Sequence, residues 1–239
     1  MAPLVNIVSL NKRFGRLQVL NDVSLQMTSG ASIALIGPNG CGKTTLIKTI
    51  LNMVLPDSGS IFFDGLDIKG AVSYRQFIGY MPQIGRYPDN MSVGQVLDTM
   101  RSLRAESAAV DDDLYHAFGM NHLLDKRMRT LSGGTRQKVS AVIAFMFRPR
   151  MLILDEPTAG LDPLSSALLQ EKIAAERRMG RLVLITSHLL SELDEMVSEV
   201  ILMHDGAVAF HRSSEHLKEE AGEERLSKAI TAVLRRSQA

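Results

Sequence analysis

The sequence predicts an α/β fold with a mainly parallel core sheet, an N-terminal antiparallel β subdomain and an inserted helical subdomain. Short apolar strands alternate with helical stretches at both ends of the chain, which is typical of layered α/β proteins. Helical periodicity then dominates from about residue 91 to 147. A glycine-rich loop also follows one of the apolar strands and opens a helix.

Length and composition limit the function classes. The 239 residues suit one large domain, or a domain with a subdomain, and 45% of them are apolar. The 27 basic and 26 acidic residues nearly cancel, so no nucleic acid partner is expected. The one cysteine, Cys41, can form neither a disulfide framework nor a cysteine metal cluster, which indicates a reducing compartment.

The sequence contains no apolar run of the ~18 residues that a membrane helix needs. The start, Met1 to Leu10, has no basic leader and is predicted to be a strand instead of a signal peptide. A cytoplasmic chain is therefore expected, and any role at a membrane would come through a partner.

The N-terminal part is predicted to alternate between strands and one helix. The segment Ser32 to Ile36 is a short apolar run that ends at Gly37, as a buried parallel strand does. The other predicted elements are the strands Leu4–Ser9, Val23–Met27, Ser60–Asp64 and Ile78–Met81 and the helix Thr44–Val54.

In the middle, a helix is predicted from Met91 to Arg104, where Ser92 and Gln95 form a capping box. A second helix is predicted from Asp111 to Phe118. Its three leading acids suit a helix N-terminus, and we interpret them as a solvated face without further function.

Strands return in the last third. Asp162 and Pro163 are predicted to start a helix, and Leu189 to Val197 carries an apolar stripe at helical spacing. The predicted strands are Met151–Leu154 and Leu182–Thr186, followed by a hairpin of Val200–Met203 and Ala207–Phe210. The tail 213–239 is charged and helix-prone.

The glycine-rich loop matches the phosphate-binding pattern G-x-x-x-x-G-K-[ST]. Its glycines let successive backbone N–H groups point at phosphate oxygens. Lys43 is expected to reach the β- and γ-phosphates, Thr44 to bind Mg²⁺, and Thr45 to support the α-phosphate side. The motif consists of Gly37, Pro38, Asn39, Gly40, Cys41, Gly42, Lys43 and Thr44. Cys41 is either a redox switch or a small residue that fills the loop, and the second interpretation is favoured.

Two acids end the apolar strand at Met151–Leu154. Asp155 is placed to hold Mg²⁺ through water. Because side chains alternate along a strand, Glu156 is expected on the opposite side, where it could polarise an attacking water.

Three further segments complete a pattern. They are Leu131-Ser132-Gly133-Gly134-Thr135, Gln83 after one strand and His188 after another. Together with Asp155-Glu156-Pro157 and Gly160-Leu161-Asp162, they closely resemble the nucleotide-binding subunit of ATP-binding-cassette (ABC) transporters, a P-loop NTPase family. The resemblance covers roughly residues 4 to 210. It implies an ATP-binding domain over 4–212, with the helical subdomain 91–147 inserted in it and a helical tail after it.

The resemblance also implies ATP and Mg²⁺ as ligands and a role for each site residue. Phe14 would stack on the adenine. Gln83 would touch Mg²⁺ or the attacking water, and His188 the γ-phosphate. Ser132, Gly133 and Gly134 would hold the γ-phosphate bound to the other subunit of a head-to-tail homodimer, and Asp162 would pack across that dimer.

The family further implies an integral membrane permease as partner, of exporter type, and a position on the inner face of the cell membrane. The chain departs from the family at Phe14, where Tyr is commoner, and at Thr135, where Gln is commoner. Because Phe reads no base edge, we expect weak discrimination of ATP from GTP. A fainter resemblance is to the ATPases that serve copper-site maturation of nitrous oxide reductase.

Three other function classes are disfavoured by the sequence. A soluble ABC ATPase acting on DNA or ribosomes usually needs long coiled-coil insertions or two cassettes, for which 239 residues leave no room. A P-loop GTPase needs the pattern Asn-Lys-x-Asp, and the run from Asn11 to Phe14 lacks the Asp. A cassette that only binds ATP is disfavoured by Glu156 and His188.

Overall fold

A computed structural model of the protein describes residues 2–103, 110–194 and 196–237. It contains two sheets. The first is antiparallel, in the order β2 (Leu17–Met27), β1 (Val5–Phe14), β4 (Ser58–Phe63) and β5 (Leu66–Asp67). The second follows the order β10 (Ala207–Ser213), β9 (Glu199–His204), β3 (Ser32–Ile36), β8 (Leu182–Thr186), β7 (Met151–Asp155) and β6 (Ile78–Met81).

The second sheet is parallel except for its edge strand β10, which pairs antiparallel with β9. Its central strands are buried on both faces, which explains why their sequences are apolar without alternation. In β7, for example, Leu152 and Leu154 contribute to one hydrophobic core and Met151 and Ile153 to the other. The antiparallel sheet and the first helix cover one face, and most other helices cover the second.

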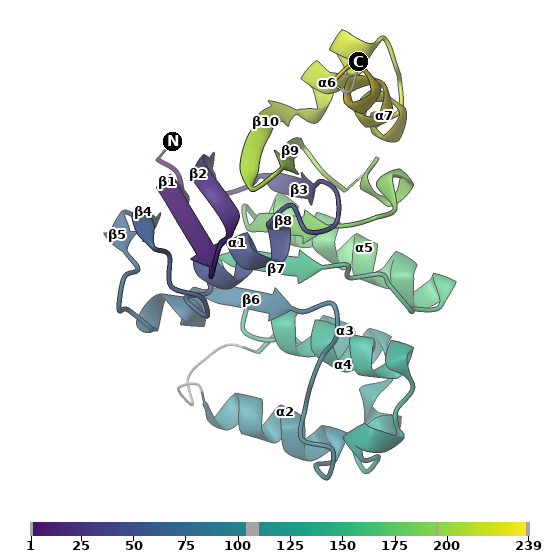
Figure 1. Ribbon diagram of the computed structural model, residues 1–239. Coiled ribbons are helices and arrows are strands. Elements are labelled where there is room, and N and C mark those ends of the chain that lie inside the picture. The colour runs from purple at the N-terminus through teal and green to yellow at the C-terminus, as the bar shows by residue number, and fades with distance from the viewer. Residues whose placement is uncertain (1, 104–109, 195, 238–239) are drawn as a thin grey trace.

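The helices are α1 (Lys43–Ile50), α2 (Val93–Ser102), α3 (Asp113–Ala117), α4 (Gly133–Phe145), α5 (Pro163–Arg178), α6 (Ser214–Ala221) and α7 (Leu226–Ser237). Figure 1 shows α2, α3 and α4 beyond the β6 edge of the core sheet, while α6 and α7 lie at the opposite end, next to β10. Short 3₁₀ turns occur at Ser73–Phe77, Met120–Leu123, Met128–Thr130 and Leu190–Leu193. Among the residues that the structure describes, no helix combines the length and hydropathy needed to cross a bilayer.

The predicted fold class is confirmed, and so are several local signals. The strands Ser32–Ile36, Ile78–Met81 and Leu182–Thr186 have the predicted bounds. Both halves of the capping box between Ser92 and Gln95 are present at α2. The predicted end of that helix, Arg104, lies outside the described residues.

Two predictions about helices are wrong. The helix predicted to Val54 ends at Ile50, because Asn52 adopts the left-handed conformation (φ 52°) that terminates helices. Among the described residues of the apolar stripe from Leu189 to Val197, the structure has the 3₁₀ turn Leu190–Leu193 and no α-helix. The connection from β8 to β9 has only residues 187–198, and it must cross β3, which lies between these two strands in the sheet. Few residues therefore remain for a longer helix.

The three acids at the start of α3 are only partly a solvated face, since Asp112 and Asp113 are exposed but Asp111 is not. Asp111 is buried, and its Oδ2 lies 2.6 Å from Nζ of Lys172, a residue of α5 that is itself buried. Lys172 also lies 2.7 Å from Asp113 and 3.0 Å from the buried carboxylate of Glu176. The acids therefore tie the helical segment to α5, a long-range pairing that the local sequence does not show.

Candidate active site

The candidate site lies at the carboxyl edge of the parallel sheet. The neighbouring strands β3, β8, β7 and β6 all end there, and each is followed by chemically active residues. A cavity of about 430 Å³ opens at this edge. It is lined by Val19, Asn39, Gly40, Gly42, Lys43, Thr44, Thr45, Gln83, Asp155, Glu156, Thr186, Ser187 and His188. Loops far apart in sequence thus converge on one cavity.

The glycine-rich loop after β3 is packed too tightly for side chains at two positions. A Cβ at Gly37 would lie 2.2 Å from the carbonyl oxygen of Met203, and one at Gly42 would lie 2.5 Å from that of Val19. Both glycines also have positive φ angles, of 148° and 104°. The two glycines are therefore needed because the loop packs against the backbone of β9 and of β2. The loop leads directly into α1, whose first residue is Lys43.

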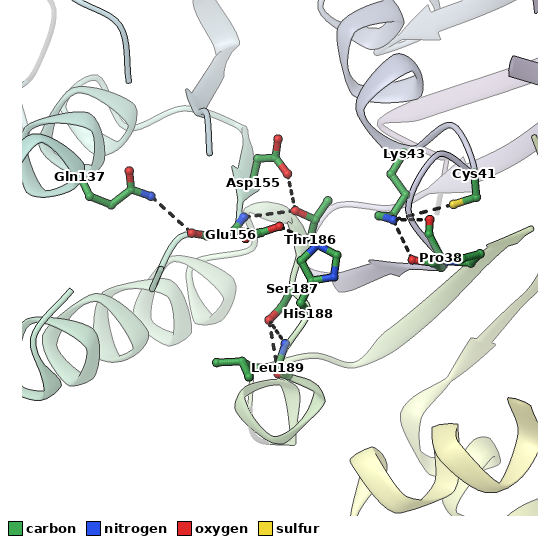
Figure 2. A network of polar contacts seen from close by, with 11 residues as sticks. Pro38, Cys41, Lys43, Gln137, Asp155, Glu156, Thr186, Ser187, His188 and Leu189 are labelled. Carbon is green, nitrogen blue, oxygen red and sulfur yellow. Dashed lines mark hydrogen bonds and ion pairs between the residues drawn. The ribbon is translucent and has the colours of Figure 1, made fainter. Parts of the chain in front are cut away.

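Lys43 is a cation with only neutral partners. Its Nζ donates to the carbonyl oxygens of Gly37 at 2.7 Å and Pro38 at 3.0 Å, and lies 3.8 Å from Sγ of Cys41 (Figure 2). Within the described residues, no carboxylate forms an ion pair with it. An unpaired cation beside the N-terminus of α1 fits an anionic ligand such as a phosphate group.

Asp155 is the last residue of β7, and its side chain is almost fully buried. Its Oδ1 accepts a hydrogen bond from the hydroxyl of Thr186, the last residue of β8. This contact fixes the carboxylate at the edge where the two strands end.

Glu156 is held at three points. Its N–H donates to the backbone oxygen and the hydroxyl of Thr186, both at 3.1 Å, and its carbonyl oxygen accepts from Nε2 of Gln137 at 3.3 Å. Its Oε1 lies 2.8 Å from Nε2 of His188 (Figure 2). The backbone has a φ of 51°, an uncommon value for a residue with a side chain and one that is frequent at functional sites.

The prediction that Glu156 points to the side opposite Asp155 is wrong. β7 ends at Asp155, and the left-handed conformation of Glu156 breaks the alternation of a strand. Both residues line the same cavity.

The donor atoms at the cavity fit Mg²⁺. Thr44, Gln83 and Asp155 offer a hydroxyl, an amide oxygen and one carboxylate. No cluster of three or more His, Cys, Asp or Glu side chains suited to a metal occurs in the described part of the chain. Mg²⁺ usually takes one or two carboxylates and completes its shell with waters and phosphate oxygens, so few protein ligands suffice.

Eight of the predicted site residues do not line the cavity. Gly37, Pro38 and Cys41 belong to the glycine-rich loop beside it, and the other five lie elsewhere. These five are Phe14, Ser132, Gly133, Gly134 and Asp162. Phe14 is half exposed at the end of β1, with Nζ of Lys12 lying 5.4 Å from its ring centroid.

Ser132 caps α4, and its hydroxyl accepts the N–H of Thr135 at 3.2 Å. Asp162 caps α5 in the same way and pairs with Lys138 of α4 at 2.8 Å. The hydrogen bonds from Lys138 and Ser165 hold the pKa of Asp162 well below its ordinary value. In addition, a Cβ at Gly134 would lie 2.3 Å from the carbonyl oxygen of Gly160, so the start of α4 packs directly on the turn before α5.

Sequence reasoning missed Thr186 and Gln137, which position Asp155 and Glu156. Thr186 had a weak signal, since it is a polar residue at the end of an apolar strand. Gln137 had none, since it stands between Arg136 and Lys138 in the sequence and only the fold buries it in α4. Sequence reasoning also missed Val19, because only folding brings β2 to the glycine-rich loop.

Comparison with known proteins agrees with this geometry. A family model described as "ABC transporter" matches residues 20–159. The chain is similar to the lipopolysaccharide export system ATP-binding protein LptB of Acidithiobacillus ferridurans, with 35% identity over 215 residues that cover 87% of this chain and 89% of the relative. It is 32% identical to the ABC transporter ATP-binding protein NatA of Bacillus subtilis, over 94% of this chain and 95% of that one.

Solved structures show the same fold. An ATP-binding subunit of an ABC transporter superposes with a TM-score of 0.87 at 26% identity, over 95% of this chain and 98% of the other. A dimeric ATP-binding cassette in a post-hydrolysis state, bound to ADP and Pi, superposes with a TM-score of 0.78 at 19% identity, over 87% and 98% of the two chains. The family match spans more than half of the chain and the first relative nearly all of it, and on these grounds the protein belongs to the ABC transporter family, among its ATP-binding subunits.

Proposed function

We propose that this chain hydrolyses ATP in the cavity at the carboxyl edge of its parallel sheet, as the motor subunit of an ABC transporter. The observation that carries the proposal is the pairing of Glu156 and His188, 2.8 Å apart, in the same cavity as the unpaired cation of Lys43. A carboxylate held beside a phosphate-binding loop is suited to accept a proton from water.

The proposed binding mode uses groups that line or adjoin the cavity. Lys43 exchanges the carbonyl oxygens of Gly37 and Pro38 for the β- and γ-phosphates, and the N–H groups of the loop and of α1 complete the phosphate cradle. Thr45 supports the α-phosphate side. Mg²⁺, for which Thr44, Gln83 and Asp155 are the candidate residues, supplies positive charge against the phosphate oxygens.

In the reaction itself, a water oxygen bonds to the γ-phosphorus while the bond from that phosphorus to the bridging oxygen breaks. Glu156 accepts the proton of the water, and ADP leaves with the electron pair of the broken bond. His188 holds the carboxylate of Glu156 and contacts the γ-phosphate, so it stabilises the negative charge there.

Head-to-tail pairing of two copies accounts for the residues outside the cavity. Ser132, Gly133 and Gly134 form a second helix N-terminus, and Gly133 has open space around it. In the proposed dimer, this surface meets the γ-phosphate bound to the other copy, and Asp162 lies between the copies. Phe14 is exposed and therefore free to stack on the adenine.

The proposal extends to the setting of the dimer. The dimer drives an exporter-type membrane permease from the inner face of the cell membrane, and Gln83 links the ATP site to that partner. Residues 4–212 form the ATP-binding domain, with the helical subdomain 91–147 inserted, and 213–239 form a tail. The names of the relatives described above concern lipopolysaccharide export and ABC transport, not copper, and the fainter resemblance to copper-maturation ATPases is not taken further.

The test of the transport role is a co-purification. A tagged Glu156→Gln variant is solubilised gently from membranes in Mg²⁺–ATP, and the proteins that accompany it are identified by mass spectrometry. Recovery of a protein with several membrane spans supports the transporter role. Recovery of soluble partners, DNA or ribosomes alone would overturn it and favour a soluble ABC ATPase.

A further inference from the structure

We propose that Glu192 is a positioning residue for hydrolysis: by accepting a hydrogen bond from Thr158, it keeps the turn that carries Glu156 aligned with the turn that carries His188. The inference deepens the proposed function and rests on it. Neither residue lines the candidate active site, so the role would be exerted through Glu156 and His188.

The contact itself is specific. Oγ1 of Thr158 donates to Oε2 of Glu192 at 2.5 Å, and both side chains are partly buried. A hydroxyl that donates to a carboxylate forms one of the shorter and stronger hydrogen bonds in proteins. The two residues are 34 positions apart in sequence, so the contact joins separate segments.

The spacing relates this contact to the reacting groups. Thr158 follows Glu156 by two residues, and Glu192 follows His188 by four. Pro157 stands between Glu156 and Thr158 and restricts its own φ angle, which stiffens the short connection. The contacts 156–188 and 158–192 therefore bridge the same two turns.

The turns need such a bridge because the sheet ends before them. The paired register of β7 and β8 stops at Asp155 and Thr186. Beyond it, the segment with His188 is exposed: the His188 side chain is 52% and Leu189 60% accessible. The hydroxyl of Ser187 accepts the N–H of Leu189, which is a local contact and ties the segment to nothing else.

Glu192 can act as an anchor because its own segment is fixed. It lies in the 3₁₀ turn Leu190–Leu193, in which Leu193 is fully buried in the hydrophobic core. The carboxylate of Glu192 thus connects the turn after β7, through Thr158, to a segment that Leu193 fixes in the hydrophobic core.

The same region offers a matched control. Glu192 also lines a cavity of about 800 Å³ between α5 and the tail helices. Glu171 of α5 lines that cavity too and is exposed. Replacing either glutamate with methionine removes a carboxylate from the cavity, but only the change at position 192 removes the acceptor for Thr158.

The experiment measures kcat and KM for ATP, together with the melting temperature, for the full chain and its variants. We expect Thr158→Val and Glu192→Met each to lower kcat by about 10-fold, since a small misplacement of reacting groups costs up to ~100-fold in rate. KM should stay unchanged because the phosphate loop is untouched, and the double variant should be no slower than either single one. Thr158→Ser and Glu192→Gln, which keep a donor and an acceptor, should retain most of kcat, and Glu171→Met all of it.

Two results would overturn the proposal while leaving the proposed function intact. The first is that Thr158→Val and Glu192→Met both keep the kcat of the wild type. The second is that kcat of the double variant falls by the product of the two single factors, which would mean that the two residues act independently. A fall in kcat matched by Glu171→Met would also overturn it, since the cavity and not the contact would then be responsible. A wild-type chain without any hydrolysis would instead remove the proposed function. If Thr158→Val fails to fold, the comparison of Glu192→Met with Glu192→Gln decides.

Discussion

Nε2 of His188 lies 2.8 Å from Oε1 of Glu156, although the two residues follow different strands and 31 residues of the chain separate them. β7 and β8 are neighbours, so their carboxyl ends deliver both side chains to one cavity. The pair places a hydrogen-bonded carboxylate opposite a loop that carries an unpaired cation.

Lys43→Ala should weaken ATP binding by about 10- to 100-fold, the loss expected when hydrogen bonds from a charged group are removed. The fold should survive, because Lys43 contacts only two carbonyl oxygens and a thiol. Titration calorimetry with Mg²⁺–ATP measures the effect. Lys48→Ala, an exposed residue in the last turn of the same helix, is the control and should bind normally. Equal affinity in both variants would remove Lys43 from the site.

Phe14→Ala should weaken the binding of ATP and GTP by a similar factor, about 10-fold, as expected for the loss of one stacking contact with a base. Phe14 is 51% exposed, which leaves its ring available to a base. Competition binding with both nucleotides tests this. A variant that loses ATP affinity but keeps GTP affinity would show that the base edge is read near Phe14.

Gly133→Ala and Gly134→Ala should differ sharply although the glycines are neighbours. A Cβ at Gly134 would collide with the carbonyl oxygen of Gly160, so that variant should lose stability by about 1–3 kcal/mol. A Cβ at Gly133 meets nothing within 4 Å, so the melting temperature should be kept. The methyl group of Gly133→Ala would nevertheless lie on the surface proposed to meet the partner's ATP.

Gel filtration in Mg²⁺–ATP, with Glu156→Gln, which is predicted to hydrolyse ATP slowly, as background, measures the consequence for pairing. Gly133→Ala should reduce the dimer fraction without changing the melting temperature. A full dimer fraction would argue that the start of α4 does not take part in pairing.

Lys172→Met should destabilise the fold by about 3–5 kcal/mol, because it leaves the buried carboxylates of Asp111 and Glu176 without their main counter-charge. Burial alone would lower the pKa of Lys172, but the hydrogen bonds that its ammonium group donates to the carboxylates of Asp111, Asp113 and Glu176 outweigh burial and raise that pKa. The stabilisation is therefore complete below the ordinary value of 10.5 and is lost only as the pH rises through the higher folded value.

Urea unfolding at neutral pH measures this free energy. Lys228→Met, at an exposed position of α7, is the control and should change stability by less than about 0.5 kcal/mol. A loss at Lys172 no larger than that of the control would mean that the buried cluster adds nothing to stability.

The sequence predicted most of what depends on local chemistry. Apolar strands without alternation, the capping box at Ser92 and the aspartate cap at Asp162 are written in neighbouring residues, and the structure contains all of them. The glycine-rich loop was also recognisable, although the reason for Gly37 and Gly42 is packing against Met203 and Val19, which only the fold reveals.

What the sequence did not predict depends on distant contacts. Asp111 has the sequence context of a surface acid, but in the fold Lys172 of α5 lies against it. The direction of the Glu156 side chain depends on the left-handed backbone conformation of Glu156 itself, directly after β7, and strand periodicity does not predict that conformation. The bridge from Thr158 to Glu192 joins two turns that no local pattern relates.

The most direct test of the central claim compares phosphate release by the wild-type chain and by Glu156→Gln, with ATP binding measured on the same samples. We predict that Glu156→Gln binds Mg²⁺–ATP as tightly as the wild type, releases phosphate at least about 100-fold more slowly and accumulates as a dimer, because only the proton acceptor has been removed. Phosphate release by Glu156→Gln at the wild-type rate would contradict the claim that Glu156 accepts the proton of the attacking water.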